Sequence, residues 1–386
     1  MFNIPSFPTC QSLVALLLTS PRTGLPFLPT PMGKGVVPDS DPHNTSSARS
    51  TALKESDVIL VLGARLNWIL HYGEPPKWNE AAKIIQVDIS AEELGRNSGD
   101  SRLSIFGDIG LAIDELVSQL AGWQWQSQSQ LSTFQRNLQA SKAKNEAGAA
   151  RKARVDKIPM TFERVFDVIK TTLHRLSVPE NGDIVYISEG SNTMDISRSI
   201  FTVEHPRLRL DAGTYATMGV GLGYAIAAHA AFNNSQPEAT SGQPGRKKVV
   251  AIEGDSSFGF SAMEVETMAR YEMDVLIFVI NNSGIYHGDS HSADQWLSRQ
   301  LATAERATAN GAGLRSLSLG YEVGYEKIAE TCGGIGFLAR TPAELERATE
   351  EGYKAKVPVI VNVIIEPGDD KIMVSLPTRL IATTAA

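Results

Sequence analysis

Two polar side chains that follow neighbouring apolar runs suit the chemistry of a metal–phosphate site. Asp255 follows the apolar run 249–253, and Asn282 follows the run 275–280. Residues 258–271 between these runs have helical spacing, so the segment is predicted to be strand, helix, strand with parallel strands. Both strands then end at the same edge of a sheet, and Asp255 and Asn282 converge there. Oxygen ligands of this kind suit Mg²⁺ or Ca²⁺, and the ion in turn holds a diphosphate.

Backbone N–H groups add a second component to this predicted site. Ser256 and Ser257 open the predicted helix, and the N–H groups at such a helix start bind anions. The alternative is a simple turn, since Gly-Asp pairs also begin at positions 107, 182, 288 and 368, where a turn explains them better. The pair at 255 and 282 differs because both members lie at strand ends around a helix. We therefore assign it a diphosphate–metal role.

The composition fits a globular protein of ordinary type. The chain has 386 residues, of which 42% are hydrophobic and 20% charged. A net charge of −7 without a long basic run argues against nucleic acid as a partner. The two cysteines favour a reducing compartment. No apolar run approaches the roughly 20 residues of a membrane span, so no membrane partner is expected, and the run 13–18 is interpreted as a buried helix truncated by the chain start.

Several motifs, taken together, resemble one enzyme family. Gly254–Ser256 with Asn281–Asn282 is similar to the signature of thiamine-diphosphate enzymes. The wider sequence resembles 2-hydroxyacyl-CoA lyase and its relative oxalyl-CoA decarboxylase from about Gly24 to Pro367. The motifs that carry the likeness lie, in the family's order, at 26–38, 63–71, 188–196, 210–225, 254–267 and 281–286.

The resemblance implies an α/β fold with two doubly wound parallel-sheet domains. These are the middle domain and the diphosphate-binding domain of the thiamine-diphosphate enzyme fold, with the pyrimidine-binding domain absent. We expect a partial central domain over 1–120 and a partly helical inter-domain linker over 121–158. A thiamine-diphosphate-binding domain is expected over 159–368 and a diverged tail over 369–386.

Apolar runs and helical spacing predict the elements of these domains. In the first domain, the continuous apolar runs 57–63 and 83–89 predict strands. The run 57–63 is typical of a strand covered on both faces. Residues 111–120 are predicted to be a helix. In the second domain we predict strands at 184–188, 207–211, 249–253, 275–280 and 359–365, and a small-residue helix through 219–231.

The resemblance also assigns roles to the metal and diphosphate residues. It implies that Asp255 and Asn282 bind Mg²⁺ through side-chain oxygens and that Gly284 does so through its carbonyl. Diphosphate oxygens are expected to accept hydrogen bonds from the backbone N–H groups of Ser256, Ser257 and Ile285.

Four further residues are expected around thiamine diphosphate. Met218 is expected to wedge between the two rings of the cofactor, with a core methionine as the alternative. The carbonyl of Ala216 is the candidate acceptor for the exocyclic amine of the cofactor. Ser191 and Asn192 follow a predicted strand that ends at the same edge, and they either contact the cofactor or cap a helix.

Nucleotide contacts are predicted in both domains. By similarity to oxalyl-CoA decarboxylase, Arg65 and Asp88 at strand ends of the first domain bind ADP; a surface salt bridge is the alternative. Arg198 is a candidate for a CoA phosphate. One of Tyr286, His287 and His291 is expected to line the substrate channel, and an ordinary loop role is the alternative for each.

The resemblance implies a thiamine-diphosphate- and Mg²⁺-dependent lyase that cleaves 2-hydroxyacyl-CoA to formyl-CoA and an aldehyde, as in fatty acid α-oxidation. Relatives carry a cofactor-activating glutamate in the pyrimidine-binding domain, which this sequence does not match, so we expect an N-terminally truncated chain with little activity alone. The alternatives are a non-catalytic fragment or regulatory partner, and an oxalyl-CoA decarboxylase-like activity.

Partners and localisation follow from the same resemblance. We expect an acyl-CoA substrate and either a homo-oligomer or pairing with a full-length subunit. Eukaryotic relatives are peroxisomal, which predicts the peroxisome, but the ending Thr384–Ala386 is not a Ser-Lys-Leu-type signal. The cytoplasm is the alternative.

Overall fold

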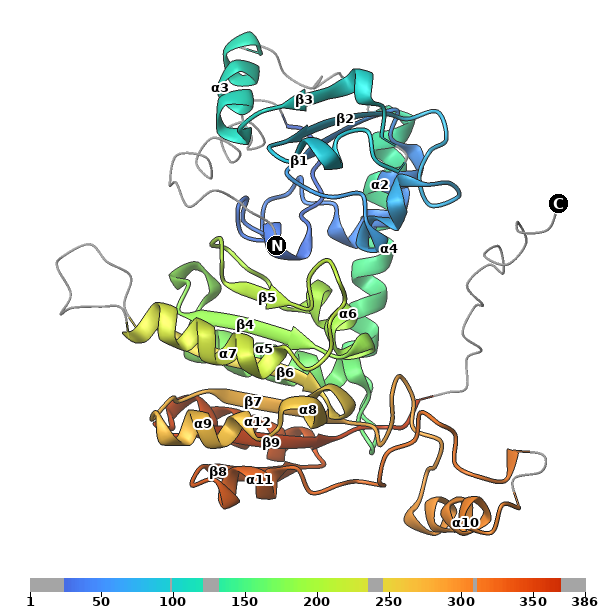
Figure 1. The fold of residues 1–386 in the computed structure, drawn as a ribbon, viewed down its shortest axis with the longest axis vertical. Helices are drawn as coiled ribbons and strands as arrows, with labels where there is room; N and C mark the ends of the chain where they lie inside the picture. Colours follow the sequence, from blue (N-terminus) through green and yellow to red (C-terminus); the bar gives the residue numbers. More distant parts are fainter. Residues whose placement is uncertain (1–23, 98, 121–131, 235–245, 308–310, 369–386) are drawn as a thin grey trace.

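Two parallel sheets, one in each half of the chain, organise the protein. The computed structural model describes residues 24–97, 99–120, 132–234, 246–307 and 311–368 (Figure 1). The arrangement confirms the predicted α/β fold with two parallel-sheet domains. No helix within these ranges has the length and apolar character that a membrane crossing needs. The expected helix at 13–18 and the tail after 368 lie outside the described residues.

The first domain contains a three-stranded sheet with helices on opposite faces. Its strands, in order across the sheet, are β1 (Val58–Leu62), β2 (Lys83–Asp88) and β3 (Ser104–Phe106). The α-helices are α2 (Arg49–Glu55) and α3 (Ile109–Gln119), and the short 3₁₀ helices are η1 (Pro31–Gly33), η2 (Ser46–Ala48), η3 (Trp68–Gly73), η4 (Ala91–Glu93) and η5 (Ser101–Leu103). Leu53 of α2 packs on the face that carries Val61, and Ile113 of α3 packs on the face that carries Val87.

Strand β1 departs from the expectation that both of its faces are covered. Val58 and Leu60 alternate along the strand and therefore share a face, and they are 54% and 38% exposed. Among the described strands, β1 pairs only with β2, and α3 packs near the carboxyl end of the sheet, where Leu62 is covered. The expectation was wrong for this half of the strand, because an apolar run does not reveal which neighbours are present to cover it.

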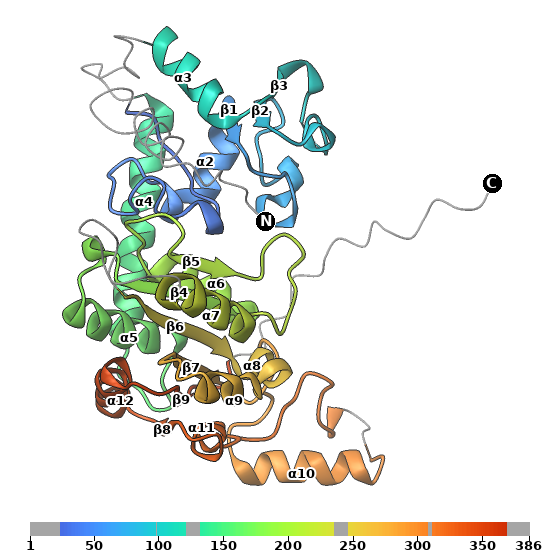
Figure 2. The same cartoon turned by 60° about the vertical axis from the view of Figure 1, so that its left-hand side comes forward.

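Helix α4 (Thr133–Ala153) runs between the two domains within the predicted linker (Figures 1 and 2). It begins at a capping box in which Ser132 and Gln135 exchange hydrogen bonds. Polar contacts hold it against the first domain: Lys142 Nζ donates to the carbonyl of Asn44 at 3.0 Å, and Asn145 Nδ2 donates to that of Ser47 at 2.7 Å. Because α4 attaches to the first domain mostly through these polar contacts, it lies on the surface of that domain and is not part of its hydrophobic core.

The second domain is built on a six-stranded parallel sheet. Across the sheet the order is β5 (Arg209–Asp211), β4 (Ile184–Glu189), β6 (Lys248–Gly254), β7 (Leu276–Asn281), β9 (Val359–Ile364) and β8 (Ile335–Ala339). Its helices are α5 (Phe162–Leu176), η6 (Pro179–Asn181), α6 (Ser191–Ile200), α7 (Gly221–His229), the π-helical turn η7 (Ala230–Asn234), α8 (Asp255–Ser261), α9 (Glu264–Arg270), α10 (Ala293–Ala304), α11 (Glu326–Thr331) and α12 (Pro342–Lys354).

Burial on both faces explains the continuous apolar runs of this sheet. Figure 2 shows α5 and α12 on one side and α7 and α9 on the other. Strands β4, β7 and β9 are buried along their whole lengths, as expected for a parallel sheet between two helical layers. All five strands predicted in this domain are present, although β5 is shorter than 207–211.

Two features of the second domain differ from the predictions. The helix expected over 258–271 begins earlier, at Asp255, and is broken between Ser261 and Glu264 into α8 and α9. Strand β8 was not predicted, because it is an edge strand with partly exposed residues and its pattern is weak. The small-residue helix is present as α7 and ends in the η7 turn.

The core of the second domain yields a prediction about stability. Ile360 in β9 is fully buried, so Ile360→Ala is expected to lower the free energy of unfolding by about 2–5 kcal/mol. Leu338→Ala in β8, where the side chain is 43% exposed, is the matched control and should cost about 1 kcal/mol or less. Urea denaturation followed by circular dichroism measures both. Equal losses would contradict the assignment of Ile360 to the core.

Candidate functional site

The carboxyl ends of β4, β6 and β7 meet at one edge of the second sheet and frame a cavity. In the strand register, Glu189 lies opposite Glu253, and Gly254 lies opposite Ile280. A cavity of about 40 Å³ lies at this edge. The predicted metal and cofactor residues that line it are Ser191, Asn192, Met218, Asp255, Ser256, Ser257, Asn282, Gly284 and Ile285. The structure thus brings together every residue predicted for this site except Ala216.

Asp255, the first residue of α8, is buried beside the cavity. It is 2% exposed, and its carboxylate accepts hydrogen bonds from Ser256 N at 2.8 Å and from Gly284 N at 3.1 Å. Burial raises the pKa of the Asp255 carboxyl to about 7, although these N–H groups act in the opposite direction. The partners recorded for this carboxylate are backbone N–H groups and not basic side chains, so a bound cation would offset its charge.

Asn282 lies close to Asp255 because both side chains contact the same N–H group. Asn282 Oδ1 accepts from Gly284 N at 3.2 Å. Its Nδ2 donates to the carbonyl of Tyr286 at 3.0 Å, and Asn192 Nδ2 from α6 donates to that same carbonyl at 3.1 Å. Asn192 therefore connects α6 to the loop after β7. Convergence of Asp255 and Asn282 is the geometry that the strand–helix–strand pattern predicts.

The loop after β7 is held by a segment far along the chain. Ser283 and Tyr286 have left-handed backbone angles, with φ of 61° and 64°, which non-glycine residues adopt only when their surroundings hold them. Ile285 N donates to the carbonyl of Leu317 at 2.9 Å, and Glu322 N donates to Ser283 Oγ at 2.9 Å. A Cβ at Gly284 would lie 2.5 Å from the carbonyl oxygen of His287, so this position requires glycine.

Gly190 links β4 to α6 and forms one wall of the cavity. Its φ is +95°, and a Cβ there would lie 2.7 Å from Ser257 Oγ and 2.9 Å from Gly254 N. Both α6 and α8 begin at the cavity, and neither has a side-chain cap. N-terminal N–H groups without a side-chain cap suit the oxygens of an anion. Together with the Asp255 carboxylate, these residues fit a diphosphate that holds a divalent cation.

Met218 and Ala216 lie on the loop between β5 and α7. Met218 reaches the cavity and remains 38% exposed, which argues against the alternative of a core methionine. Ala216 is exposed, has a φ of 51° and does not line the cavity. The role predicted for its carbonyl therefore stays a prediction.

The two residues predicted to bind a nucleotide lie at the carboxyl edge of the first sheet: Arg65 follows β1, and Asp88 is the last residue of β2. Arg65 Nε lies 3.5 Å from Glu93 Oε1, which is the salt bridge considered as the alternative. Asp88 Oδ1 accepts a hydrogen bond from Ser90 N at 2.8 Å. Each side chain has a local partner, and the nucleotide role stays a prediction.

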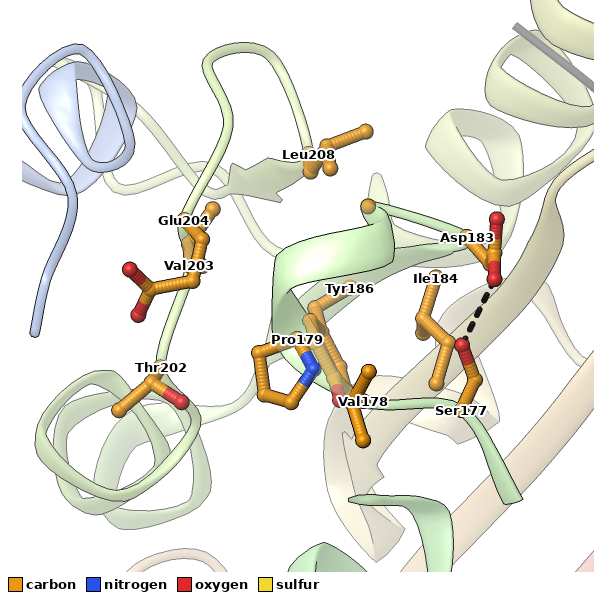
Figure 3. Close-up of a pocket in the computed structure, with 11 residues that line it drawn as sticks. Ser177, Val178, Pro179, Asp183, Ile184, Tyr186, Thr202, Val203, Glu204 and Leu208 are labelled. Atoms are coloured by element: carbon orange, nitrogen blue, oxygen red, sulfur yellow. Dashed lines mark hydrogen bonds between the residues drawn. The ribbon is translucent and has the colours of Figure 1, made fainter. Parts of the chain in front are cut away.

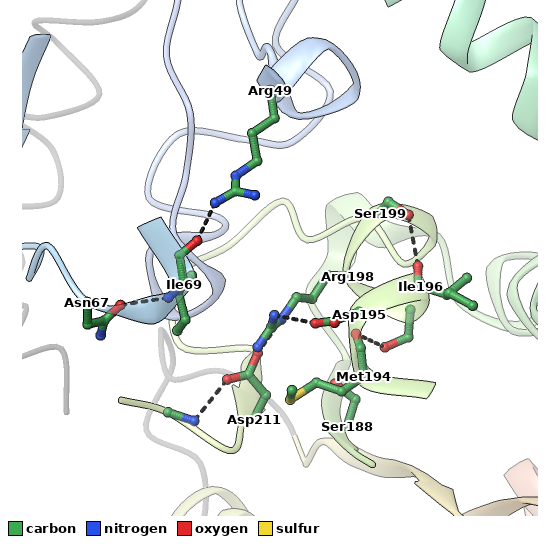
Figure 4. Close-up of polar contacts among 12 residues, drawn as sticks. Arg49, Asn67, Ile69, Ser188, Met194, Asp195, Ile196, Arg198, Ser199 and Asp211 are labelled. Carbon is green, nitrogen blue, oxygen red and sulfur yellow. Dashed lines mark hydrogen bonds and ion pairs between the residues drawn. The ribbon is translucent and has the colours of Figure 1, made fainter. Parts of the chain in front are cut away.

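Arg198 lies where the two domains meet (Figure 4). It donates from Nε to Asp211 at 2.9 Å and from Nη1 to Asp195 at 2.7 Å, while its Nη2 is buried without a hydrogen-bond partner among the described residues. Arg49 of α2 approaches from the first domain and bonds to the carbonyl of Ile69. Burial, and then the charge of Arg198, lowers the pKa of Arg49.

A second, smaller cavity lies at the opposite edge of the same sheet, near the start of β4 (Figure 3). Its volume is about 20 Å³, which is room for a water molecule. Asp183 accepts a hydrogen bond from Ser177 Oγ at 2.8 Å on one side of it. Pro179, Ile184 and Tyr186 make the rest of its surroundings largely apolar, so this cavity is separate from the candidate site.

Sequence reasoning missed several cavity residues. Gly190 and Thr193 line the site beside residues that were predicted, and a glycine between a strand and a helix is a signal that could have found Gly190. Phe162 at the start of α5 also lines it, and no local pattern marks that residue, since it reaches the cavity through tertiary packing. Of the three candidates for the substrate channel, Tyr286 lines the cavity; His287 and His291 do not.

Two family matches cover the parts of the chain that form the two sheets. Residues 13–116 match the central domain of thiamine pyrophosphate enzymes, and residues 189–363 match their C-terminal TPP binding domain. The second match includes Asp255, Asn282 and every other metal or cofactor residue predicted from the sequence.

Curated relatives from several organisms are similar over most of this chain. The chain is 42% identical to 2-hydroxyacyl-CoA lyase 1 of Mus musculus over 347 residues, which are 90% of this chain and 56% of that protein. It is 40% identical to 2-hydroxyacyl-CoA lyase of Saccharomyces cerevisiae over 353 residues, with the same two shares. For oxalyl-CoA decarboxylase of Escherichia coli the identity is 35% over 347 residues, 89% of this chain and 54% of that protein. The chain spans about half the length of the curated relatives it matches.

The cavity wall yields a prediction that compares two glycines. Gly190→Ala places a methyl group against Ser257 and Gly254 and forces an alanine into a left-handed conformation, so the expected loss of stability is about 2 kcal/mol or more. Gly259→Ala in α8 is the control, because nothing lies within 4 Å of the added Cβ and alanine favours a helix by about 1 kcal/mol. Thermal denaturation measures both, and equal destabilisation would contradict the described cavity wall.

Proposed function

This chain belongs to the thiamine-diphosphate enzyme family, and from that premise we propose that it binds thiamine diphosphate with Mg²⁺ and serves as a carbon–carbon lyase of the 2-hydroxyacyl-CoA lyase type. The reaction proposed is cleavage of a 2-hydroxyacyl-CoA to formyl-CoA and an aldehyde, as in fatty acid α-oxidation. One observation carries the proposal: Asp255 and Asn282 converge at a cavity that is also lined by the starts of α6 and α8.

The chain's own residues would hold the cofactor at its diphosphate end. Asp255 and Asn282 would bind Mg²⁺ through side-chain oxygens and Gly284 through its carbonyl, which is the oxygen-rich set that Mg²⁺ prefers. The backbone N–H group of Ser257 would hold a diphosphate oxygen. Those of Ser256 and Ile285 donate to Asp255 Oδ1 and to the Leu317 carbonyl in this structure, so each would exchange that partner to hold a diphosphate oxygen as predicted. Bound thiamine diphosphate supplies the electron sink for cleavage of a carbon–carbon bond.

The buried charge of Asp255 supports a cation at this place. A carboxylate taken out of water is costly unless it is paired or coordinates a metal. The backbone N–H groups of Ser256 and Gly284 offset part of that cost, and a divalent cation would offset the rest. Met218 also lines the cavity and would support the rings of the cofactor, and Ser191 and Asn192 would add polar contacts.

Two arginine side chains at the meeting of the two domains support an acyl-CoA substrate, although Asp195 and Asp211 pair with one of them. Arg198 has a buried Nη2 without a partner among the described residues. Arg49 approaches from the first domain (Figure 4), and burial, followed by the charge of Arg198, lowers the pKa of Arg49. Guanidinium groups bind phosphate through pairs of N–H donors. We assign Arg198 and Arg49 to a phosphate of CoA. An adenine nucleotide such as ADP at Arg65 and Asp88 is a further proposal that rests on the family resemblance.

We propose that this chain alone turns over slowly. The family resemblance implies that a glutamate outside the two matched domains activates the cofactor, so the chain would work as a homo-oligomer with low activity or by pairing with a full-length subunit. A peroxisomal localisation, with the cytoplasm as the alternative, rests on the same resemblance. The rival functions are a non-catalytic partner and an oxalyl-CoA decarboxylase-like enzyme.

Cofactor binding is tested by removing the predicted metal ligand. Asp255→Asn is expected to weaken Mg²⁺-dependent binding of thiamine diphosphate more than about 100-fold, since even outer-shell partners of a metal contribute 10–100-fold. Isothermal titration calorimetry with and without Mg²⁺ gives the affinities. Asp183→Asn, at the opposite edge of the sheet, is the control and should bind like the unchanged chain. If the unchanged chain does not bind thiamine diphosphate, or if Asp255→Asn binds equally well, the proposal is wrong.

The substrate class is tested with the purified chain, thiamine diphosphate and Mg²⁺. With a 2-hydroxyacyl-CoA we expect slow release of formyl-CoA and an aldehyde, far below the rate of a full-length 2-hydroxyacyl-CoA lyase in the same assay. If this chain pairs with a full-length subunit, adding that subunit should raise the amount of formyl-CoA released per molecule of this chain. Carbon dioxide release from oxalyl-CoA would favour the decarboxylase alternative, and a rate equal to that of the full-length enzyme would contradict dependence on a partner.

A further inference from the structure

Helix α7 begins at the candidate site without a cap of its own. Its N-cap residue, Val220, provides no side-chain hydrogen bond, although the first N–H groups of any helix need acceptors. Met218 lies on the loop immediately before this helix and lines the cavity. The group that accepts hydrogen bonds from the first N–H groups of α7 therefore also determines where Met218 lies.

The acceptor is the carboxylate of Glu189, the last residue of β4. Its two oxygens accept hydrogen bonds from Gly219 N and Gly221 N, one oxygen for each. Glu189 is fully buried. Burial raises the pKa of its carboxyl, and the N–H groups of Gly221, Gly219 and Val220 oppose that shift. A carboxylate at the positive end of α7 is also favoured by the helix dipole.

Glycines at 219 and 221 make this contact possible. At Gly221 a Cβ would lie 2.2 Å from Glu253 Oε1 and 2.8 Å from Glu189 Oε2, so only glycine allows the helix start to approach the two carboxyl groups. At Gly219 the φ is +82° and a Cβ would lie 2.8 Å from Phe260 Cβ. Gly223, by contrast, has nothing within 4 Å. The glycine-rich start of α7 thus serves close packing at positions 219 and 221.

Glu253 is the other carboxyl group beside this contact. It lies opposite Glu189 in the register of β4 and β6, it is fully buried, and neither of its side-chain oxygens has a hydrogen-bond partner among the described residues. Glu253 therefore closes the space behind Gly221 but does not hold the loop. The hydrogen bonds that hold the loop come from Glu189.

We propose that Glu189 is a positioning residue that fixes Met218 at the cofactor cavity by binding the N–H groups of Gly219 and Gly221. The cofactor part of this inference rests on the proposed function. The end of β4 then organises the site in two directions: through Gly190 it leads to Ser191 and Asn192, and through the Glu189 carboxylate it holds Met218.

The contact itself is tested without cofactor. Glu189→Gln keeps the size of the side chain but offers one acceptor oxygen, so at least one of the two N–H groups loses its partner. In a chain labelled with ¹⁵N-glycine, the amide protons of Gly219 and Gly221 are expected at low field, as for N–H groups bound to a carboxylate, and at least one should move upfield in Glu189→Gln. Unchanged positions of both signals would overturn the proposal.

Positioning through Met218 is tested by a double-mutant cycle of thiamine diphosphate affinity. Glu189→Gln and Met218→Ala are each expected to weaken Mg²⁺-dependent binding about tenfold, and the double variant should be no weaker than Met218→Ala alone, because coupled residues are not additive. Met218 is a partly exposed loop residue, so its variant tests the idea even if Glu189→Gln folds poorly. Additive losses would overturn the proposal.

A buried carboxylate elsewhere in the domain controls for general destabilisation. Asp274 precedes β7 at the opposite edge of the sheet and binds Arg246 at 2.6 Å and His229, the last residue of α7, at 3.1 Å. Its replacement therefore disturbs the far end of this helix and not the start that Glu189 binds. Asp274→Asn should lower the melting temperature yet leave the Gly219 and Gly221 signals and the affinity unchanged. Equal loss of affinity in Asp274→Asn would reduce Glu189 to a structural role and overturn the proposal. If the unchanged chain binds no cofactor, the proposed function fails, and the glycine signals alone decide whether Glu189 holds the loop.

Discussion

The hydrogen-bonded register of β4, β6 and β7 is the constraint on which the site depends. Because these strands are parallel neighbours, Glu189, Gly254 and Asn281 end at the same edge of the sheet. Residues distant in the sequence therefore meet at this edge. The same register keeps the strands buried between two helical layers, so the precision of the site and the stability of the domain have a common origin. A change that shifted one strand by a residue would turn its buried side chains to the other face and separate Asp255 from Asn282.

Buried carboxylates held by backbone N–H groups are the second theme of this edge. Asp255 and Glu189 are both removed from water, and both accept hydrogen bonds from the main chain. Such groups cost stability unless their charge is compensated. At Asp255 the compensation is only partial, which is consistent with a cation site. At Glu189 the compensation comes from the N–H groups at the start of α7, and these hydrogen bonds connect the loop before α7 to the end of β4. The two carboxylates thus have similar surroundings and different roles.

The contacts described between the two domains are polar. Helix α4 attaches to the first domain largely through hydrogen bonds, and Arg49 and Arg198 face each other from opposite domains. At this meeting of domains Asp195 and Asp211 pair with Arg198, and the buried Nη2 of Arg198 has no hydrogen-bond partner among the described residues. The exposed half of β1 in the first domain leaves apolar surface uncovered in the described structure. The chain spans about half the length of the curated relatives it matches.

The sequence by itself determined the α/β class, five of the six strands of the second sheet and the convergence of Asp255 with Asn282, because apolar runs and strand-end residues are local patterns that follow from backbone geometry. It also identified Met218 and the residues that open α8. Only the tertiary structure decided which faces of β1 are covered, where the 258–271 helix breaks, that β8 completes the sheet, and that Phe162 reaches the cavity. It also decided that Glu189 binds the start of α7. Each of these depends on which distant segment packs against a residue, and no local pattern records that neighbour.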